Sequence, residues 1–487
     1  MASRSLIILI VLLAFSSVSS AQTAFSHYYG NSELDSGKDV VVDSEGNVIV
    51  VGSTGSYNDN NDGYYLGLDD EGNIFESTSF GGSGSDWFEA VVPYSGDYIA
   101  VGTSNSFNNF DYDFWVVHFA QNGEVINEVA IDAGDWDFAR DVVVIESGEI
   151  VVVGETYSAD FGARDGWIVK LSNDFQVVDE LFVGGAYEDQ LNAITQLELG
   201  QLVAAGALQN AEGNHDHALW WIDENNFEIT QELTYGEEEF DDYTNELTVA
   251  ANGNLYLVGA TNNTEGFGGI YDMYFYFVTP TGEFLEERFY GGEDVDGTNC
   301  ITQLPSGEFV IAGFTYSWGN NAGLYKNAKS YRTSINGWWQ SGMNPTLGDN
   351  RDEEYFGVAA CPDGGYVLAG TKQDEFTEIQ YVYVVKILED NTFVEFPSYI
   401  QDANSISEVN ILELDLIPEP SGIQITGDPA NELNVRLFDL GGKLVHQSQL
   451  RGPVNSIDLT TLTHGLYIVD ITSSKQEHFR TKISWDR

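Results

Sequence analysis

A pattern of about fifty residues recurs along the chain and constrains its fold more than any other feature. Each occurrence contains a glycine that ends its second apolar run, and successive glycines are 50, 52, 52, 53, 54 and 57 residues apart. These glycines are Gly52, Gly102, Gly154, Gly206, Gly259, Gly313 and Gly370. Regular self-similarity of this length is typical of a repeat protein, in which one structural unit is used many times.

Each unit reads as four short β-strands. In residues 132–183 the predicted strands are ARDVVVIE, EIVVVGET, DGWIVKL and QVVDELFV. They alternate apolar and polar residues and are rich in β-branched side chains, and turn sequences such as SGE separate them. Seven four-stranded units arranged around an axis form a β-propeller, which leaves no long exposed sheet edge. We therefore expect an all-β protein with a seven-bladed β-propeller.

An acidic residue follows the opening of every unit. The seven positions are Asp35, Asp86, Asp137, Asp189, Asp241, Asp296 and Glu353. Residues required in every blade are usually architectural: the glycine allows close backbone approach, and the acid caps a turn. The alternative is a ring of carboxylates around a central ion.

Two segments compete to close the ring. AFSHYYG near the N-terminus is similar to the fourth strand FLEERFYGG, so we expect it to pair with the last blade. FVEFPSYI, near residue 396, is the other candidate.

The motif YGGxxxDxxxxVxxxxxGxxVVxGxTxS followed by DxWVVKL resembles secreted bacterial propeller repeats related to the delta-sixty class. The resemblance covers about residues 24–398. It implies the propeller fold and provides no common catalytic residues.

Composition changes after Asp402 and marks a second domain. Residues 419–487 hold 7 basic and 8 acidic residues, whereas the preceding residues hold 12 and 69. We predict a signal peptide at 1–21, a propeller at 22–402, a linker at 403–415 and a small β-sandwich at 416–487. No segment after the signal peptide is apolar enough to span a membrane.

The tail segments NVRLFDLGGKLV and NSIDLTTLTHGLYIVDI resemble the type A sorting domain of the type IX secretion system of Bacteroidota. The matching residues are Asp439, Gly442, Leu444, Gly465, Leu466 and Tyr467. The family usually shows Pro-Asn-Pro where this chain has Pro418, Glu419 and Pro420. The resemblance implies the type IX machinery as a partner, export through the outer membrane, and release or attachment at the cell surface.

The formal charge of −58 comes from 77 acidic and 19 basic residues. Such a charge excludes unaided nucleic-acid binding and disfavours anionic membranes. It is consistent with a solvated acidic shell, and also with cation capture by clustered carboxylates. Cys300 and Cys361 are predicted to be buried free thiols, with a disulfide as the alternative.

Two loops suggest metal ligands. YNDNNDG in the first unit places Asn58, Asn60, Asp62 and Asp69 at spacings similar to a calcium loop, although common turn chemistry also explains it. NHDHALWW in the fourth unit contains a His-x-His pair, which could hold a transition metal or serve as ordinary loop residues. The sequence establishes no cofactor, and calcium is the candidate that it suggests.

The sixth unit departs most from the consensus, and a unique partner requires a unique surface. It carries Lys326, Lys329 and Arg332 together with Trp318, Trp338 and Trp339. Cations and indoles can hold an anionic or sugar-like ligand. We therefore predict ligand binding by Trp318, Lys326, Lys329 and Arg332. Trp338 and Trp339 are expected in the fourth strand, one of them facing the core.

No nucleophile elbow, phosphate loop, zinc-helix motif or dinucleotide fingerprint is present in the sequence. We therefore expect a secreted or cell-surface propeller that binds a glycan or a surface protein. The alternative is an extracellular polysaccharide-degrading enzyme with carboxylates at the propeller axis.

Overall fold

The computed structural model describes most of the chain between residues 23 and 485. The described ranges are 23–30, 34–55, 60–107, 111–157, 164–197, 200–237, 239–263, 270–319, 322–338, 340, 345–347, 351–374, 379–394, 397–401, 415–419, 422–426, 432–439, 444–451, 454–460, 462, 465–473 and 478–485. The predicted signal peptide at 1–21 and the predicted linker up to residue 414 lie outside them. The chain divides into two compact units, Met1–Ser405 and Ile406–Arg487.

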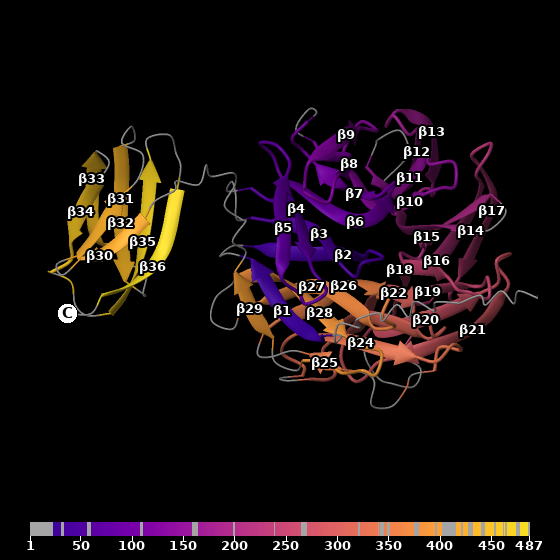
Figure 1. The fold of residues 1–487 in the computed structure, drawn as a ribbon. Helices are drawn as coiled ribbons and strands as arrows, with labels where there is room; N and C mark the ends of the chain where they lie inside the picture. The colour runs from indigo at the N-terminus through magenta and orange to yellow at the C-terminus, as the bar shows by residue number, and fades with distance from the viewer. Residues whose placement is uncertain are drawn as a thin grey trace, which may run out of the picture. The chain divides into compact units, whose positions relative to one another are not determined.

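The first unit is a seven-bladed β-propeller, as predicted (Figure 1). Blade 1 comprises β2 (Asp35–Val42), β3 (Val48–Thr54), β4 (Asp62–Leu68) and β5 (Ile74–Phe80). Blade 2 comprises β6 (Asp86–Tyr94), β7 (Asp97–Ser104), β8 (Asp113–Phe119) and β9 (Val125–Ile131). Blade 3 comprises β10 (Asp137–Val144), β11 (Ile150–Thr156), β12 (Asp165–Leu171) and β13 (Val177–Val183). Blade 4 comprises β14 (Gln190–Leu197), β15 (Gln201–Gln209), β16 (His215–Asp223) and β17 (Glu228–Tyr235).

The remaining blades follow the same antiparallel order. Blade 5 comprises β18 (Asp242–Val249), β19 (Leu255–Thr261), β20 (Asp272–Val278) and β21 (Phe284–Tyr290). Blade 6 comprises β22 (Asp296–Gln303), β23 (Phe309–Thr315), β24 (Asn327–Thr333) and the short β25 (Thr346–Leu347). Blade 7 comprises β26 (Glu353–Ala360), β27 (Tyr366–Gln373) and β28 (Gln380–Ile387), completed by β1 (Phe25–Gly30) and β29 (Ser398–Gln401).

Both candidate segments take part in closing the ring. β1 pairs antiparallel with β28, with Tyr28 opposite Tyr383, and so supplies the fourth strand of blade 7. β29 adds to the outer side of β1 in parallel, with Tyr28 opposite Tyr399. The N-terminal strand therefore closes the ring, as predicted, and the second segment adds a fifth strand.

Apolar side chains fill the spaces between neighbouring blades. Between blades 2 and 3, for example, Val101 and Phe114 pack with Val142, Val152 and Trp167, all of them buried. Burial of such side chains provides the main favourable contribution to folding, at about 25 cal/mol per Å² of apolar surface. The two cysteines are buried free thiols within this core, as predicted.

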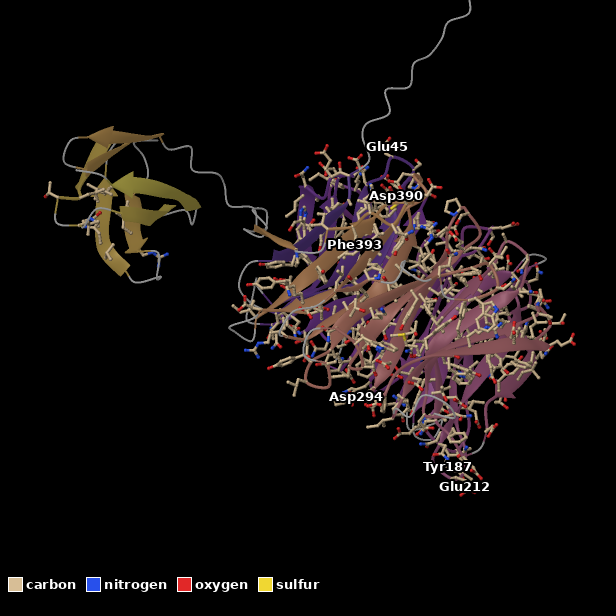
Figure 2. The ribbon with its side chains drawn as sticks, turned by 90° about the horizontal axis from the view of Figure 1, so that it is seen from below. Glu45, Tyr187, Glu212, Asp294, Asp390 and Phe393 are labelled. Carbon is tan, nitrogen blue, oxygen red and sulfur yellow. The ribbon has the colours of Figure 1, made fainter. Side chains whose placement is uncertain are left out.

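The outside of the propeller carries the acidic shell. Carboxylates project from its surface, among them Glu45, Glu212, Asp294 and Asp390, which Figure 2 labels. Such exposed groups remain hydrated, so they add negative charge without a large desolvation cost.

Each repeated glycine faces a β-bulge in the first strand of its own blade. At Gly154, for example, a Cβ atom would lie 2.0 Å from the Phe138 carbonyl oxygen. The register between β10 and β11 shifts between Ala139 and Asp141, so Arg140 is the extra residue of the bulge. All seven blades have this shift at the equivalent place. The glycine is therefore architectural, because it leaves room for the bulged strand.

The repeated acids cap the turns that lead from one blade to the next. Asp86 accepts hydrogen bonds from the Gly82 N–H (2.8 Å) and from the Ser104 hydroxyl. In blade 5 the equivalent residue is Asp242, which pairs with Thr261, and not Asp241 as the sequence suggested. Two adjacent aspartates made the assignment ambiguous by one position.

The second unit contains two sheets, ordered β30-β31-β34 and β33-β32-β35-β36. Its strands are β30 (Asp415–Glu419), β31 (Gly422–Thr426), β32 (Glu432–Asp439), β33 (Leu444–Arg451), β34 (Val454–Asp458), β35 (Gly465–Ser473) and β36 (His478–Trp485). Asp439 and Tyr467 of the predicted sorting motif are opposite one another in the β32–β35 pair. Gly442 lies outside the described residues.

Candidate functional site

The bulges create a cavity at the propeller axis. Each bulge adds one residue to the innermost strand of its blade, and these residues are Lys38, Glu89, Arg140, Asn192, Asn245, Asn299 and Phe356. All seven line a cavity of about 170 Å³, together with Asp39, Ala90, Asp141 and Glu246. The cavity therefore gathers one position from every repeat, and the side chains at that position differ in charge and polarity between blades.

Charged side chains occupy the side of the cavity formed by blades 1 to 3. The Glu89 carboxylate lies 3.5 Å from the Lys38 ammonium and 3.8 Å from the Arg140 guanidinium. Arg140 also pairs with Glu155 at 2.7 Å. Arg140 keeps about a third of its side chain exposed, at 35%. A ligand can therefore reach the guanidinium while Glu155 holds it in position.

Three asparagines occupy the side formed by blades 4 to 6, and each connects its blade to the next. Asn192 donates to the Thr244 carbonyl (2.8 Å), and Asn245 donates to the Thr298 carbonyl (2.9 Å). Asn299 donates to the Tyr355 carbonyl at 2.8 Å. These bonds fix the amide groups, and an amide has further hydrogen-bonding capacity because it carries two N–H donors and one acceptor.

The carboxylates of Asp39, Asp141 and Glu246 also line this cavity. The Asp39 carboxylate accepts from its neighbour Val40 N–H (2.7 Å) and from Val91 N–H of the next blade (2.9 Å). Asp141 makes the equivalent bonds to Val142 N–H and Ile194 N–H, each at 2.7 Å. These carboxylates therefore connect blade 1 to blade 2 and blade 3 to blade 4.

Burial makes these carboxylates weak acids. It raises the pKa of Asp39 to about 6, against the opposing effect of the two backbone N–H donors. Burial also raises the pKa of Asp141 and of Glu246, and the Asp39 carboxylate raises both further. The cavity thus contains proton-holding groups beside fixed cations.

Phe356 completes the lining and is the one aromatic residue among the cavity-lining side chains. The Lys38 ammonium lies 4.5 Å from the centre of its ring. A cavity with a ring, amides, carboxylates and cations can hold a hydroxyl-rich ligand, because such groups donate to and accept from hydroxyls while the ring covers an apolar face.

Of the basic residues predicted in blade 6, Lys329 and Arg332 lie in strand β24, and Lys326 directly precedes it. Lys326 pairs with Glu354 at 2.6 Å, just before β24. Arg332 is 5% exposed and its guanidinium pairs with Glu308 at 2.6 Å. Lys329 is 6% exposed, and burial lowers its pKa to about 8.

The tryptophans of blade 6 are placed differently from the expectation. Trp318 is 36% exposed, with the Lys329 ammonium 5.8 Å from its ring. Trp338 is 58% exposed and lies in the turn after β24, where the Arg288 guanidinium stacks on it at 4.1 Å. The assignment of Trp338 to the fourth strand was therefore wrong, because that strand is β25. Trp339 lies outside the described residues.

The predicted calcium residues of blade 1 do not form one group. Asp62 begins β4, whereas Asp69 follows its other end and caps a turn through the Asn73 N–H at 2.8 Å. Seven residues of extended strand separate two such positions by about 20 Å. The Asn60 amide donates to the Ser83 carbonyl, and Asn58 lies outside the described residues.

The two histidines of blade 4 lie on one face of β16, as alternation requires. His217 is buried, contacts the Thr244 hydroxyl at 2.8 Å and stacks on Tyr274. Burial lowers the pKa of His217 to about 3. His215 contacts Asp241 and Tyr243. Both rings thus have partners within the protein.

Comparison with known proteins identifies the tail. Residues 416–484 match the family of secretion system C-terminal sorting domains. An uncharacterized protein of Aquifex aeolicus (strain VF5) is 33% identical over 129 residues, which are 26% of this chain and 34% of that protein. The chain therefore spans about a third of the length of that curated relative.

The chain is also similar, at low sequence identity, to several solved structures. The Pan2 WD40 domain of Neurospora crassa is 12% identical to this chain. The match covers 74% of this chain and 91% of the Pan2 chain, with a TM-score of 0.45. Puromycin hydrolase is 12% identical, with 82% of this chain and 59% of its own covered and a TM-score of 0.48. PorZ, a surface component of the type IX secretion system of Porphyromonas gingivalis, is 8% identical, with 93% and 81% covered and a TM-score of 0.28.

Within the described ranges, no helix is long and apolar enough to cross a membrane. The family match places an export signal at the C-terminus, in the unit whose strands contain the predicted motif. The tail of this chain is therefore a sorting domain of the type IX secretion system, and the protein is a seven-bladed β-propeller exported to the cell surface or the medium by that route.

Proposed function

We propose that the exported propeller is a binding protein that holds a hydroxyl-rich group, such as a sugar residue of a glycan, in its axial cavity. The observation that carries this proposal is the composition of the seven bulges. Their glycine partners are the same in every blade, whereas the bulged residues are a lysine, a glutamate, an arginine, three asparagines and a phenylalanine. Function is expected where a repeat departs from its own consensus.

The chemistry of the cavity supports a sugar over an apolar ligand. Fixed amides and charged groups form directional hydrogen bonds, which discriminate strongly because a missing partner leaves a buried polar group unpaired. Phe356 provides the single apolar face that a sugar ring can cover. The cavity volume of about 170 Å³ suits one small group and not an extended polymer. The expected ligand is therefore a chain end or a side group of a glycan or glycoprotein.

Binding can be measured on a glycan array and then by titration calorimetry with the full chain. Phe356→Ala and Lys38→Ala should each weaken the binding of the strongest ligand by about tenfold or more, since anchors of these types contribute about 2 kcal/mol. Phe393→Ala is the matched control, because Phe393 is 39% exposed and is not among the cavity-lining residues (Figure 2). Equal affinity in Phe356→Ala, Lys38→Ala and the parent would reject the axial site.

A glycan-cleaving enzyme is the second candidate, because Asp39, Asp141 and Glu246 have raised pKa values in the same cavity. A carboxylic acid that keeps its proton near neutral pH can act as a general acid. Release of reducing ends from a bound polysaccharide, lost in Glu246→Gln, would support the enzyme. Binding without turnover supports the binding protein.

The ligand residues predicted in blade 6 form the competing binding surface. Trp318 is 36% exposed and Lys326 keeps 32% of its side chain exposed, whereas Lys329 and Arg332 are buried. If Trp318→Ala weakens binding and Phe356→Ala does not, the partner docks on blade 6.

A further inference from the structure

Pairs of aspartates occur where one blade meets the next. One aspartate lies at the start of the third strand of a blade, within one residue of its first position, and the other lies likewise at the start of the first strand of the following blade. The pairs are Asp113 with Asp137, Asp165 with Asp189, Asp216 with Asp242, and Asp272 with Asp296. Within each pair the two like charges interact electrostatically, so these interfaces favour any arrangement that supplies a positive charge.

The interface between blades 2 and 3 adds a third aspartate. Asp132 lies five residues before Asp137, where the equivalent positions in blades 2, 4 and 6 are the glycines Gly81, Gly184 and Gly291. A Cβ atom at Gly81 would lie 2.2 Å from the Asp86 carboxylate. The chain therefore replaces a residue without a side chain by a carboxylate at the place closest to an existing acid.

The three carboxylates converge. One oxygen from each of Asp113, Asp132 and Asp137 lies within 4.8 Å of the others. Asp113 and Asp137 are buried, and Asp132 is exposed at the mouth of the group. This spacing allows three oxygens to contact one ion, with solvent access on one side.

An unsatisfied oxygen points to a ligand independently of the cluster. Asp137 is 0% exposed, and its Oδ2 accepts from the Ala133 N–H at 2.7 Å. The Thr156 hydroxyl interacts with this carboxylate, but none of the described residues places a donor at hydrogen-bonding geometry to its Oδ1. Burial raises the pKa of Asp137 to about 7 despite the Thr156 hydroxyl and the Ala133 N–H, and the Asp132 and Asp113 carboxylates raise it further. A buried carboxylate oxygen without a donor is costly unless a cation or a proton compensates it.

Blade 7 shows how the chain compensates the equivalent position with its own residues. At the start of β26 the acid is Glu353, and the Lys372 ammonium pairs with it at 2.6 Å. The third-strand position opposite is Asn327, which has no charge. In blades 2 and 3, Asp113 stands at the position of Asn327 and Asp137 at that of Glu353. The residue equivalent to Lys372 is the neutral Thr156. The positive charge that blade 7 supplies internally must therefore come from elsewhere at the three-aspartate group.

We propose that Asp113, Asp132 and Asp137 bind a calcium ion at the interface of blades 2 and 3. Calcium takes oxygen ligands in irregular arrangements and completes its shell with water. Magnesium demands near-ideal octahedral geometry, and zinc prefers nitrogen and sulfur ligands. Extracellular proteins with such sites bind calcium with dissociation constants of about 0.1–1 mM. The ion would connect the blades through one strand end of each and the loop between β9 and β10.

The test is calcium titration of the full chain by calorimetry at fixed ionic strength, with terbium luminescence as a second measurement. Trp136 is 51% exposed and adjoins Asp137, so its indole can sensitise a terbium ion bound there. Asp132→Gly is the informative variant, because three other blades fold with glycine at this position. Asp294→Asn, which removes an exposed charge of blade 6, is the matched control.

The parent and Asp294→Asn should bind one more calcium ion per chain than Asp132→Gly. With 10 mM calcium the melting temperature of the parent should rise by about 2 °C beyond that in sodium chloride of equal ionic strength, and this difference should disappear in Asp132→Gly. Equal calcium stoichiometry in the parent and Asp132→Gly would overturn the proposal. So would a melting temperature that depends only on ionic strength or pH, since screening or a shared proton would then be the compensating effect.

Discussion

Substitution of Gly154 by alanine tests the link between the repeated glycine and the bulge. The added Cβ atom would lie 2.0 Å from the Phe138 carbonyl oxygen, 2.8 Å from the Phe114 ring and 2.9 Å from the Ala139 Cα atom. Two of these contacts are with backbone, which cannot rotate away as a flexible side chain can. The β10 and β11 strands must therefore separate at the bulge.

The expected loss of stability follows from this separation. Overpacking in a core costs about 1–3 kcal/mol, and each ladder hydrogen bond that lengthens beyond useful geometry costs about 1 kcal/mol more. We expect Gly154→Ala to lower the free energy of unfolding by about 3 kcal/mol or more. Because the bulge also positions Arg140, binding in the axial cavity should weaken in any fraction that stays folded.

Urea unfolding followed by tryptophan fluorescence measures the effect. Gly185→Ala is the matched control, because its Cβ atom would have its nearest contact at 4.0 Å and should change stability by less than about 0.5 kcal/mol. A loss below about 1 kcal/mol in Gly154→Ala, or equal losses in the two variants, would show that the glycine is not needed to accommodate the bulge.

Two further predictions concern buried charge. Lys372→Met should destabilise the fold by about 3–5 kcal/mol, because it leaves Glu353 buried without its ammonium partner. The double variant Lys372→Thr with Glu353→Asp recreates the Asp–Thr pair of blades 1, 3, 5 and 6 and should recover most of this loss in urea unfolding. The melting temperature should fall as pH rises from about 4 to 7 at constant ionic strength. The pKa values of Asp39 (about 6) and Asp137 (about 7) in the folded protein exceed the ordinary value of 3.8, so the folded state holds more protons than the unfolded state over this range. Asp39→Asn should reduce this dependence on pH, and a melting temperature that rises with pH over the same range would contradict the assignment.

The repeat made the blades predictable from the sequence, whereas the bulge made the axial cavity unpredictable. Strand alternation in ARDVVVIE gives the correct strand, but Arg140 is an extra residue that interrupts the alternation by one position. An interpretation based on the alternation of side chains between the two faces of a strand cannot assign a face to such a residue. The signal that could have located the cavity was the invariant glycine opposite, since a glycine in a strand interior often marks a bulge.

In blade 6 the sequence-based prediction failed for a different reason. β24 has the sequence NAKSYRT, whose polar side chains are buried because Glu308 and other groups of the blade pair with them. Sequence patterns assume that lysine and arginine face solvent, so Lys329 and Arg332 were predicted to form a binding surface. The three-aspartate group could not be predicted from the sequence for another reason. Asp113 and Asp137 come from different blades, and only the packing of the blades brings them together.

The position of β1 has a consequence for the order of folding events. Ser26 and Tyr383 contact one another across 357 residues of chain, so blade 7 cannot be completed until almost the whole propeller has been synthesised. Joining two points so distant costs about 5 kcal/mol of chain entropy when the intervening segment is flexible, and far less once blades 1 to 6 have formed and hold the two ends near each other. We therefore expect closure of the ring to be the final step. A nascent chain leaves β1 unpaired until β28 has been made, and a chain that lacks β1 presents β28 as an open edge on which another extended strand can add.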